Sequence, residues 1–394
     1  MIREAGPVFC NKIMSGILEK AGSRSSPYVR EVESAREPLD GGGARPLCRR
    51  GAALRDTVHM TDGLVRTGKL ITVFGGSGFA GRHIVKALAE HGWRVRVASR
   101  RPDLAFHLQP SGVVGQIHAV QANLRYPDSI ARALHGADAA VNLVGLLAES
   151  GKQTFPALHV EGAKTVAEAA RAAGITKFVQ MSAIGADTAS SAAYGRTKAE
   201  GEAIVLETIP SAVVMRPSVV FGPEDQFFNR FAAMAQLLPA LPLIGGGASK
   251  LQPVYVRDVA EAVALALDGQ AQPGAVYELG GLEIRSFKEI LEFILKTTGR
   301  HRPLINLPFP VAGAVAAITE KVKALSFGLF PSILDMTRDQ VELLKHDNVV
   351  SDAAIATGRT LHGLGIAPES YEVIVPAYLY RFRKTGQYAS QRLA

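Results

Sequence analysis

Tyr194 and Lys198 are the residues whose types and spacing most directly suggest chemistry in this chain. They stand in the order Tyr-x-x-x-Lys, so on a helix both side chains lie on one face. A nearby ammonium lowers the pKa of a phenol, which can then act as a general acid or base on a carbonyl or an alcohol. Ser182 ends an apolar run before them and can hydrogen-bond the same oxygen. The three residues predict a Ser-Tyr-Lys catalytic site.

A second group of residues indicates where a nucleotide would lie. Gly75, Gly78 and Gly81 have the spacing Gly-x-x-Gly-x-x-Gly between an apolar strand pattern and an amphipathic helix pattern. The first glycine permits a tight turn, the second lets backbone approach a pyrophosphate, and the third lets helix and strand pack closely. The N–H groups of the helix N-terminus favour a phosphate. Other residues of this loop expected to bind the cofactor are Ser77, Phe79 and Arg82.

The end of the second strand pattern indicates which nucleotide is bound. An NAD site usually has Asp or Glu there, on the ribose 2′-hydroxyl, whereas this chain has Ser99, Arg100 and Arg101. Hydroxyl and guanidinium groups suit a 2′-phosphate, and Arg82 adds positive charge nearby. We therefore expect NADP(H), with NAD(H) as the alternative if these arginines are simply solvated.

Further nucleotide contacts are expected where two other strand patterns end. Asn123 and Leu124 follow the third strand pattern, where a short polar side chain can hydrogen-bond the adenine edge. Leu143, Val144 and Gly145 follow the fourth and would lie along the far phosphate and ribose. The carboxyl ends of parallel strands meet at one edge of a sheet, so these segments would share one site.

Alternating strand and helix patterns over residues 69–220 would position these side chains. The expected strands are 70–75, 94–99, 116–121, 138–144, 177–182 and 212–216, and the expected helices are 82–91, 127–135, 156–173 and 194–207. This alternation predicts an α/β fold with a Rossmann-like, doubly wound parallel sheet.

The two ends of the chain follow other patterns. Residues 223–394 are rich in Pro and Gly and predict a smaller mixed α/β lobe for a substrate or a partner, interleaved with a Rossmann domain of residues 67–222. Within this lobe we expect a helix over 257–268, a strand over 275–279 and a helix over 286–297. Residues 1–66 are rich in Gly, Arg and Ser, so we expect a disordered or spurious extension, with Met60 as the alternative start.

The stretch 308–331 is strongly apolar. One interpretation is a helix that packs on its own domain, and the other is an amphipathic segment that rests on a membrane surface or a hydrophobic partner. No uninterrupted apolar run reaches the roughly 18 residues that a membrane-spanning helix needs.

Composition limits the remaining function classes. The formal net charge is +8, but the Lys and Arg residues are scattered rather than clustered, so we expect no nucleic-acid partner. Both cysteines, Cys10 and Cys48, precede the first strand pattern, which excludes a disulfide framework in the globular part. The dispersed His residues show no metal-ligand spacing, and we expect no metal.

These motifs, in this order, resemble the short-chain dehydrogenase/reductase superfamily, in its extended or atypical branch. Segments 142–145 and 216–223 match its pattern, and the latter contacts the nicotinamide end in that family. The resemblance implies further cofactor contacts from residues at the ends of the fifth and sixth strands, namely Met181, Pro217 and Val219, and from Tyr194 and Lys198. Segments 221–231, 252–259 and 337–342 are most similar to the family of nucleotide-binding accessory subunits of respiratory complex I and their bacterial relatives.

This closer resemblance covers residues 70–390 and implies a tightly held NADPH with a structural role. It implies hydrophilic-arm subunits of complex I as partners. The expected location is the cytoplasmic face of a bacterial inner membrane, or the matrix side of the mitochondrial membrane. Two alternatives stay open: an active NADP-dependent oxidoreductase or NAD-dependent epimerase/dehydratase that uses the Ser-Tyr-Lys site, and a regulatory dinucleotide sensor without chemistry.

Overall fold

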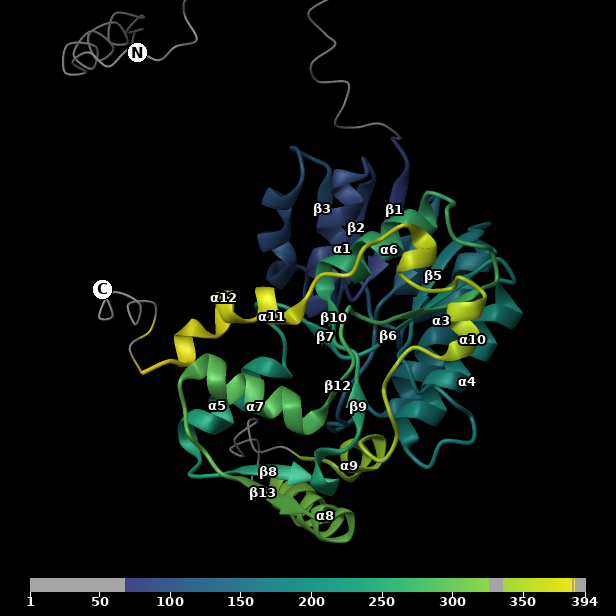
Figure 1. The fold of residues 1–394 in the computed structure, drawn as a ribbon. Helices are drawn as coiled ribbons and strands as arrows, with labels where there is room; N and C mark the ends of the chain where they lie inside the picture. Colours follow the sequence, from purple (N-terminus) through teal and green to yellow (C-terminus); the bar gives the residue numbers. More distant parts are fainter. Residues whose placement is uncertain (1–67, 326–335, 385, 387–394) are drawn as a thin grey trace, which may run out of the picture. The chain divides into compact units, whose positions relative to one another are not determined.

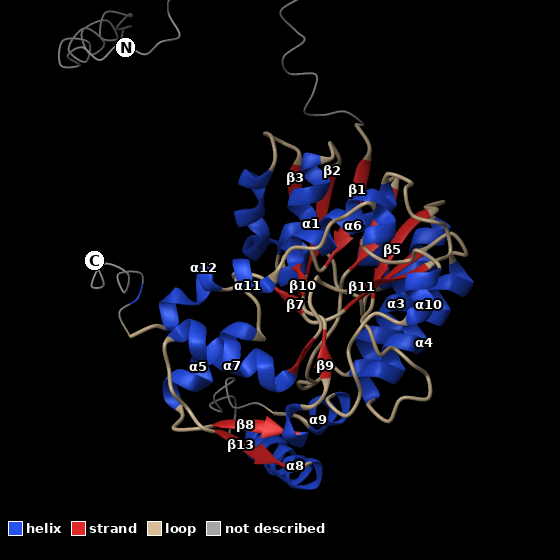
Figure 2. Ribbon diagram, viewed as in Figure 1, coloured by secondary structure: helices blue, strands red, loops and turns tan. Residues whose placement is uncertain are grey.

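A seven-stranded parallel sheet forms the centre of the molecule (Figures 1 and 2). The structure is a computed structural model and describes residues 68–325, 336–384 and 386. The strands run in the order β11-β6-β5-β4-β1-β2-β3. Their bounds are β1 (Leu70–Phe74), β2 (Arg94–Ser99), β3 (Ile117–Gln121), β4 (Ala139–Asn142), β5 (Lys177–Met181), β6 (Val213–Pro217) and β11 (Val276–Leu279). The strand order reverses between β1 and β4, which is where sheets of this kind bind ligands.

Helices cover both faces of this sheet. On one face lie α1 (Phe79–Glu90) and α6 (Val256–Leu267), which pack against each other. The other face is covered by α2 (Pro127–Leu134), α3 (Glu161–Ala172) and α4 (Ala193–Thr208). All five residues of β1 are buried, which explains why the strand reads as a continuous apolar run rather than an alternating one. The prediction of a Rossmann-like, doubly wound sheet is confirmed.

The helix expected over 257–268 and the strand expected over 275–279 are present as α6 and β11. The sequence patterns do not predict that these residues, which follow the expected domain end at 222, supply a strand to the central sheet and a helix to one of its layers. The boundary itself stays a prediction. A 3₁₀-helical segment, η1 (Pro102–Ser111), follows β2. The helix expected over 156–173 begins as a π-helical turn, η2 (Pro156–Val160), before α3.

The rest of the described chain forms small sheets and short helices. Parallel pairs are β7 (Val220–Phe221) with β10 (Val254–Tyr255) and β8 (Leu241–Ile244) with β13 (Leu304–Leu307), and the antiparallel pair is β9 (Lys250–Leu251) with β12 (Arg285–Ser286). The helices are α5 (Phe228–Leu237), α7 (Phe287–Thr298), α8 (Phe309–Leu325), α9 (Arg338–Leu343), α10 (Asp352–Ala356), α11 (Tyr371–Ile374) and α12 (Pro376–Leu379), and the short 3₁₀ segments are η3 (Gly245–Gly247), η5 (His362–Leu364) and η6 (Tyr380–Phe382). An aromatic-rich core joins α5, α7 and α11.

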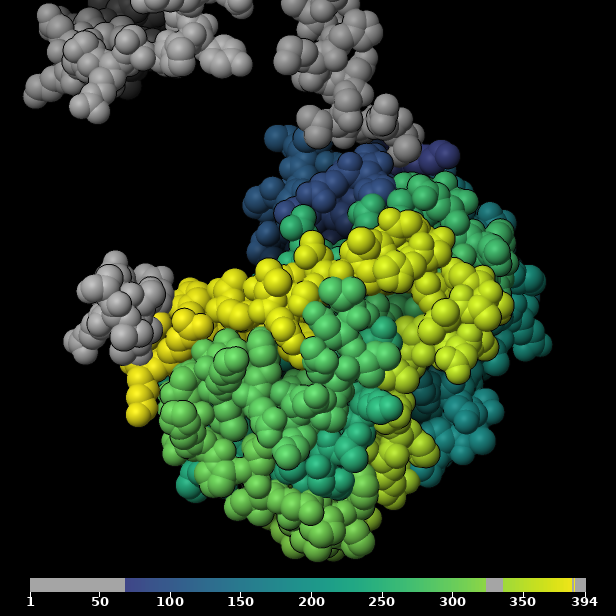
Figure 3. Space-filling model, viewed as in Figure 1, coloured from purple at the N-terminus to yellow at the C-terminus, as the bar shows by residue number. Residues whose placement is uncertain are grey.

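The segment from α10 to α12 crosses the face of the molecule shown in Figure 3, where it is yellow. Leu361 and Leu364 pack into the core of the central sheet, whereas Tyr371 and Val375 pack into the aromatic-rich core. The Tyr378 hydroxyl donates to Asp225, 2.5 Å away. This C-terminal segment therefore ties the two cores together.

The predictions for residues 1–66 and for 326–331 lie outside the described residues. None of the described helices has the length and apolar character needed to cross a bilayer.

Candidate functional site

The glycine loop between β1 and α1 has the geometry that a dinucleotide cradle needs. Gly75 adopts φ +79°, a conformation that L side chains rarely take. A Cβ added at Gly81 would lie 2.4 Å from the Gly75 carbonyl oxygen, so only glycine lets α1 pack this close to the loop. A Cβ added at Gly78 would meet only that same oxygen, at 3.3 Å, among the described atoms. The backbone at Gly78 is therefore open for a phosphate to approach.

The N-terminus of α1 is available to an anion. Gly78 is the N-cap residue, no side chain caps the helix, and no acidic residue stands in its first turn. The first N–H groups of a helix have no partner within the helix, and they carry the positive end of its dipole. Together with the opening at Gly78, these groups are arranged in a way that can accept a phosphate. On these observations the loop fits the pyrophosphate of a dinucleotide.

The side chain of Arg82 forms an ion pair with a residue that follows β7. Its guanidinium lies 3.7 Å from the carboxylate of Glu224, which also lies 3.3 Å from His83 Nε2. Arg82 Nε reaches the Gly78 carbonyl at 3.5 Å. Phe79 lies against Gly222, because a Cβ added there would meet its ring at 3.3 Å. The loop is thus held to the chain segment that follows β7.

The carboxyl end of β2 presents the expected basic group. The Ser99 hydroxyl accepts a hydrogen bond from the Arg101 backbone N–H at 3.3 Å. Arg101 pairs with Asp103 at 2.8 Å, and both side chains are more than half exposed. Arg100 is exposed and has no ion pair among the residues that the structure describes. Arg100 is therefore free to bind a 2′-phosphate, whereas Arg101 would have to exchange its carboxylate partner for one.

The segments after β3 and β4 contain the next predicted cofactor contacts, and only the one after β4 is seen to touch the glycine loop in the described chain. Asn123 holds its own turn, because its side-chain oxygen accepts the Arg125 N–H and its backbone N–H donates to Ser129 Oγ. Leu124 packs against Gly162 of α3. A Cβ added at Gly75 would lie 3.3 Å from both Leu143 and Val144, so the segment after β4 touches the glycine loop. The predicted contacts at the carboxyl ends of β1 and β4 are thus adjacent in space.

Lys198 lies between the ends of β4 and β5 and the first turns of α4, where the Ser-Tyr-Lys site is predicted. Its ammonium donates to the Met181 carbonyl at 3.3 Å, and it lies 6.0 Å from the centre of the Tyr194 ring. A Cβ added at Gly145 would lie 3.0 Å from the same nitrogen. The fold therefore brings together the ends of β4 and β5 and the first turns of α4.

Burial sets the protonation of Tyr194 and Lys198. The expectation that the Lys198 ammonium lowers the pKa of Tyr194 is wrong, because burial, with a smaller effect from Asp339, raises it to about 12. Burial lowers the pKa of Lys198 to about 8, against the opposing charge of Glu202. At neutral pH the phenol keeps its proton and the ammonium keeps its charge. Both groups can donate hydrogen bonds to a ribose hydroxyl.

Ser182 has a buried hydroxyl with no hydrogen-bond partner among the described residues. Its backbone N–H donates to the Met215 carbonyl, so β6 holds its position. An unsatisfied buried hydroxyl is costly unless something else bonds to it. Ser182 therefore suits a ligand oxygen. Pro217 ends β6 and accepts from the Ile184 N–H, and Val219 follows it, partly buried.

His159 supports this site, although the sequence patterns do not single it out. Its Nε2 accepts the Leu146 N–H at 3.0 Å, so Nδ1 carries the proton and lies 3.1 Å from Thr197 Oγ1. Burial and the charge of Lys198 lower its pKa to about 3, which keeps the ring neutral. The rings of Phe155 and Tyr194 lie 5.3 Å and 5.4 Å from it. His159 lies in the π-helical turn η2, an irregularity of the kind often found at functional sites.

No group of His, Cys, Asp and Glu side chains among the described residues is arranged to hold a metal ion.

Comparison with known proteins agrees with this geometry. Residues 71–280 match the sequence model of the NAD dependent epimerase/dehydratase family. A mitochondrial protein of Arabidopsis thaliana, NADH dehydrogenase [ubiquinone] 1 alpha subcomplex subunit 9, is 34% identical over 87% of this chain and 83% of its own. A ceramide reductase of Caulobacter vibrioides is 30% identical over 73% of this chain and 88% of its own.

Solved structures show the same fold at lower identity. The NADPH-dependent quinone oxidoreductase QOR2 of Escherichia coli, complexed with NADPH, superposes with a TM-score of 0.60 at 20% identity. The match covers 79% of this chain and 99% of that one.

Proposed function

Because the chain belongs to the NAD dependent epimerase/dehydratase family, we propose that it is a nucleotide-holding accessory subunit of an NADH:quinone oxidoreductase of the complex I type. The observation that carries this proposal is the similarity to the Arabidopsis complex I subunit, which extends over 87% of the chain rather than over the nucleotide-binding motifs alone. The described chain accordingly retains both the glycine cradle and the C-terminal elements beyond the family match.

The proposed cofactor is NADP(H). The backbone around Gly78 would hold the pyrophosphate, and Ser99, Arg100 and Arg101 would hold the 2′-phosphate. Lys198 and Tyr194 would donate to the nicotinamide ribose, with Met181, Pro217 and Val219 beside the ring. A bound nicotinamide supplies hydride chemistry, but the holding role needs only that it binds the native chain, which stabilises the fold by linkage.

The proposed partners are subunits of the hydrophilic arm, at the face of the membrane from which that arm projects. That face is cytoplasmic in a bacterium and the matrix side in a mitochondrion. We further propose that α8 rests on an anionic lipid surface. Its outer face carries Val311, Val315, Ile318 and Val322, which are 49%, 40%, 63% and 45% exposed.

The spacing of these four residues supports lipid contact. They recur every three or four positions, so they form one stripe along the helix. Ala312 and Ala316, on a different side of the helix, are fully buried. Lys321 is exposed on the same helix, and the whole chain carries a formal net charge of +8, which complements anionic headgroups.

A second candidate function is an active NADP-dependent reductase. The observation in its favour is the intact Ser182, Tyr194 and Lys198 set, in which the Ser182 hydroxyl has no partner in the described chain. The similarity to a ceramide reductase supports it. Tyr194→Phe separates the two functions: it should abolish turnover by a reductase and leave assembly of an accessory subunit unchanged.

Blue-native electrophoresis of the source membranes, with mass spectrometry to locate this chain, tests the proposal. We expect it to migrate with complex I subunits. If it migrates only as a small free species, the accessory role is wrong, and a screen for NADPH-consuming substrates with the Tyr194→Phe control should follow.

A further inference from the structure

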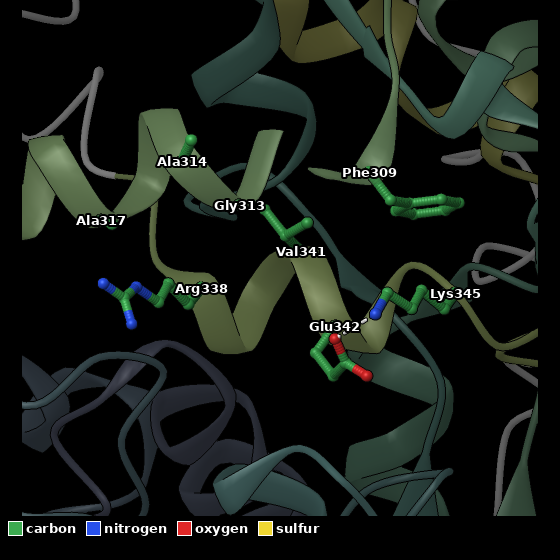
Figure 4. Close-up of a pocket in the computed structure, with 8 residues that line it drawn as sticks. All are labelled: Phe309, Gly313, Ala314, Ala317, Arg338, Val341, Glu342 and Lys345. Carbon is green, nitrogen blue, oxygen red and sulfur yellow. Dashed lines mark ion pairs between the residues drawn. The ribbon is translucent and has the colours of Figure 1, made fainter. Parts of the chain in front are cut away.

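Helix α9 lies between α8 and α4 and contacts both. On the α8 side, Val341 is 3% exposed and packs in an apolar cluster with Ala312 and Ala316. Figure 4 shows Val341 directed toward α8 across a pocket of about 380 Å³, with Arg338 and Lys345 along the same side of α9. The backbone N–H of Arg338 also donates to Glu320 of α8 at 2.9 Å. The packing of α9 therefore depends on α8.

On its other side, α9 caps the helix that carries Tyr194. The N-cap residue of α4 is Ala192, which has no side-chain oxygen, and the first turn of α4 holds no acidic residue. Asp339 supplies the missing acceptors: Oδ1 accepts the Ala193 N–H at 2.7 Å and Oδ2 accepts the Tyr194 N–H at 2.9 Å. Glu342 accepts the Ser191 hydroxyl, also at 2.7 Å.

Such a cap is energetically important because both N–H groups belong to the positive end of the α4 dipole. A carboxylate bound by two backbone N–H groups fixes the direction in which the first turn begins. Tyr194 lies in that turn, and Lys198 lies one turn further on. A change in the direction of the first turn would therefore move the Tyr194 phenol relative to Met181 and Gly145, which lie at the edge of the sheet.

We propose that Asp339 is a positioning residue for the nicotinamide half of the nucleotide site, and that α9 links this site to the α8 surface. The inference rests on the proposed function, because it needs a nucleotide held at Tyr194 and Lys198. Asp339 touches only backbone N–H groups of α4, so it acts through Tyr194. Val341 packs against α8, so a shift of α8 would move α9 and with it Asp339.

The test compares two ligands on the purified full-length chain. NADPH carries the nicotinamide half, whereas 2′,5′-ADP carries only the adenine half with its 2′-phosphate. Asp339→Asn should raise the Kd for NADPH about tenfold, the size of one charge-assisted hydrogen bond, and leave the Kd for 2′,5′-ADP within about twofold. Asp339→Glu keeps the charge and should recover part of the lost affinity. The matched control is Asp352→Asn, a loss of one carboxylate in the first turn of α10.

The link to α8 is tested by Val341→Ala, which loosens the contact without changing charge. It should raise the Kd for NADPH about threefold, again without effect on 2′,5′-ADP, and the double variant should bind no worse than Asp339→Asn, since both act through one cap. Val375→Ala removes the same atoms from another core and should change neither ligand.

The outcomes are separable. If the wild-type chain binds neither ligand, the proposed function fails first. If it binds both, and Asp339→Asn weakens both ligands equally or neither, Asp339 has no positioning role. If Val341→Ala leaves NADPH binding unchanged or adds fully to Asp339→Asn, the link to α8 is wrong.

Discussion

At the scale of single residues, the proposed choice of NADP(H) depends on the two arginines after β2. Arg100 has no ion pair in the described chain, whereas Arg101 is held by Asp103, so the two guanidinium groups differ in how readily they meet a phosphate. The pattern of charges predicts a preference for NADP(H), but only the structure shows that one of the pair must first leave a carboxylate.

The Arg100→Ala/Arg101→Ala double variant should raise the Kd for NADPH by tenfold or more, roughly the loss of one to two charge-assisted bonds. The Kd for NADH should change little, because NADH lacks the 2′-phosphate. Fluorescence titration measures both, and Arg94→Ala, at the opposite end of β2, controls for charge alone. Equal weakening of the two nucleotides would contradict the assignment.

His159 predicts a pH dependence of stability. Its pKa is about 3 in the folded chain and 6.5 for the free side chain, so below pH 6.5 the unfolded chain binds more protons. The free energy of unfolding should therefore fall as the pH drops below 6.5, by about 2 kcal/mol between pH 7 and pH 5. Urea unfolding at both pH values should show this difference in the wild type and a smaller one in His159→Gln. A difference of the same size in the variant would rule His159 out as its source.

At the level of elements, the strand–loop–helix unit of β1 and α1 gives two glycines different tasks. An added Cβ at Gly81 collides with backbone at 2.4 Å, whereas at Gly78 it meets a single backbone oxygen at 3.3 Å and φ is −73°, which alanine adopts easily. Both glycines belong to one sequence motif, but the structure requires glycine for close packing only at Gly81, and phosphate binding at Gly78 stays a prediction.

Gly78→Ala should leave thermal stability nearly unchanged and weaken NADPH binding strongly, because the methyl group occupies the phosphate approach. Gly81→Ala should instead lower the melting temperature, because α1 must move away from the loop. Calorimetry and nucleotide titration of the two variants check this contrast. Loss of stability in Gly78→Ala would show that the loop is not open as described.

The apolar stripe of α8 is an element-scale feature with its own test. Ile318→Asp should reduce cosedimentation with vesicles that contain anionic phosphatidylserine by severalfold, because it places a charge in the stripe. Ile355→Asp on α10 replaces an isoleucine that is 61% exposed, close to the 63% of Ile318, and should leave vesicle binding unchanged. Equal effects of both substitutions, or none from Ile318→Asp, would exclude lipid contact through α8.

At the scale of the whole molecule, the C-terminal segment joins the sheet and the aromatic-rich core into one folded unit. Residues of α11 and α12 complete the aromatic-rich core, while Leu361 and Leu364 complete the core of the sheet. A ligand that binds only the native unit should therefore stabilise all of it.

NADPH at a hundred times its Kd should raise the free energy of unfolding by about 2.7 kcal/mol. Thermal scans with and without the nucleotide measure this shift, and Gly78→Ala at the same concentration should show almost none. If NADPH changes the melting temperature of neither protein, a structural role for the nucleotide is wrong.

Local sequence patterns by themselves determined the secondary structure and the main motifs of the sheet domain. The sequence alone predicts the strands over residues 69–220, the glycine loop and the Tyr194–Lys198 helix, because each depends on neighbours within a few positions. The structure has a strand at each expected strand, a loop between β1 and α1, and helix α4 at Tyr194 and Lys198. Burial on both faces makes strands apolar, and a dinucleotide turn demands glycine, whatever the rest of the chain does.

Only the tertiary structure decided the contacts between distant segments. β11 pairs with β6 as a seventh strand, and Asp339 caps α4 from 146 positions away. His159 is neutral because burial and the charge of Lys198 lower its pKa. The sequence around a short strand, an Asp or a His does not show whether it has such a role. Their roles come from which groups the fold places against them, because pKa values, helix caps and sheet pairing depend on neighbours in space.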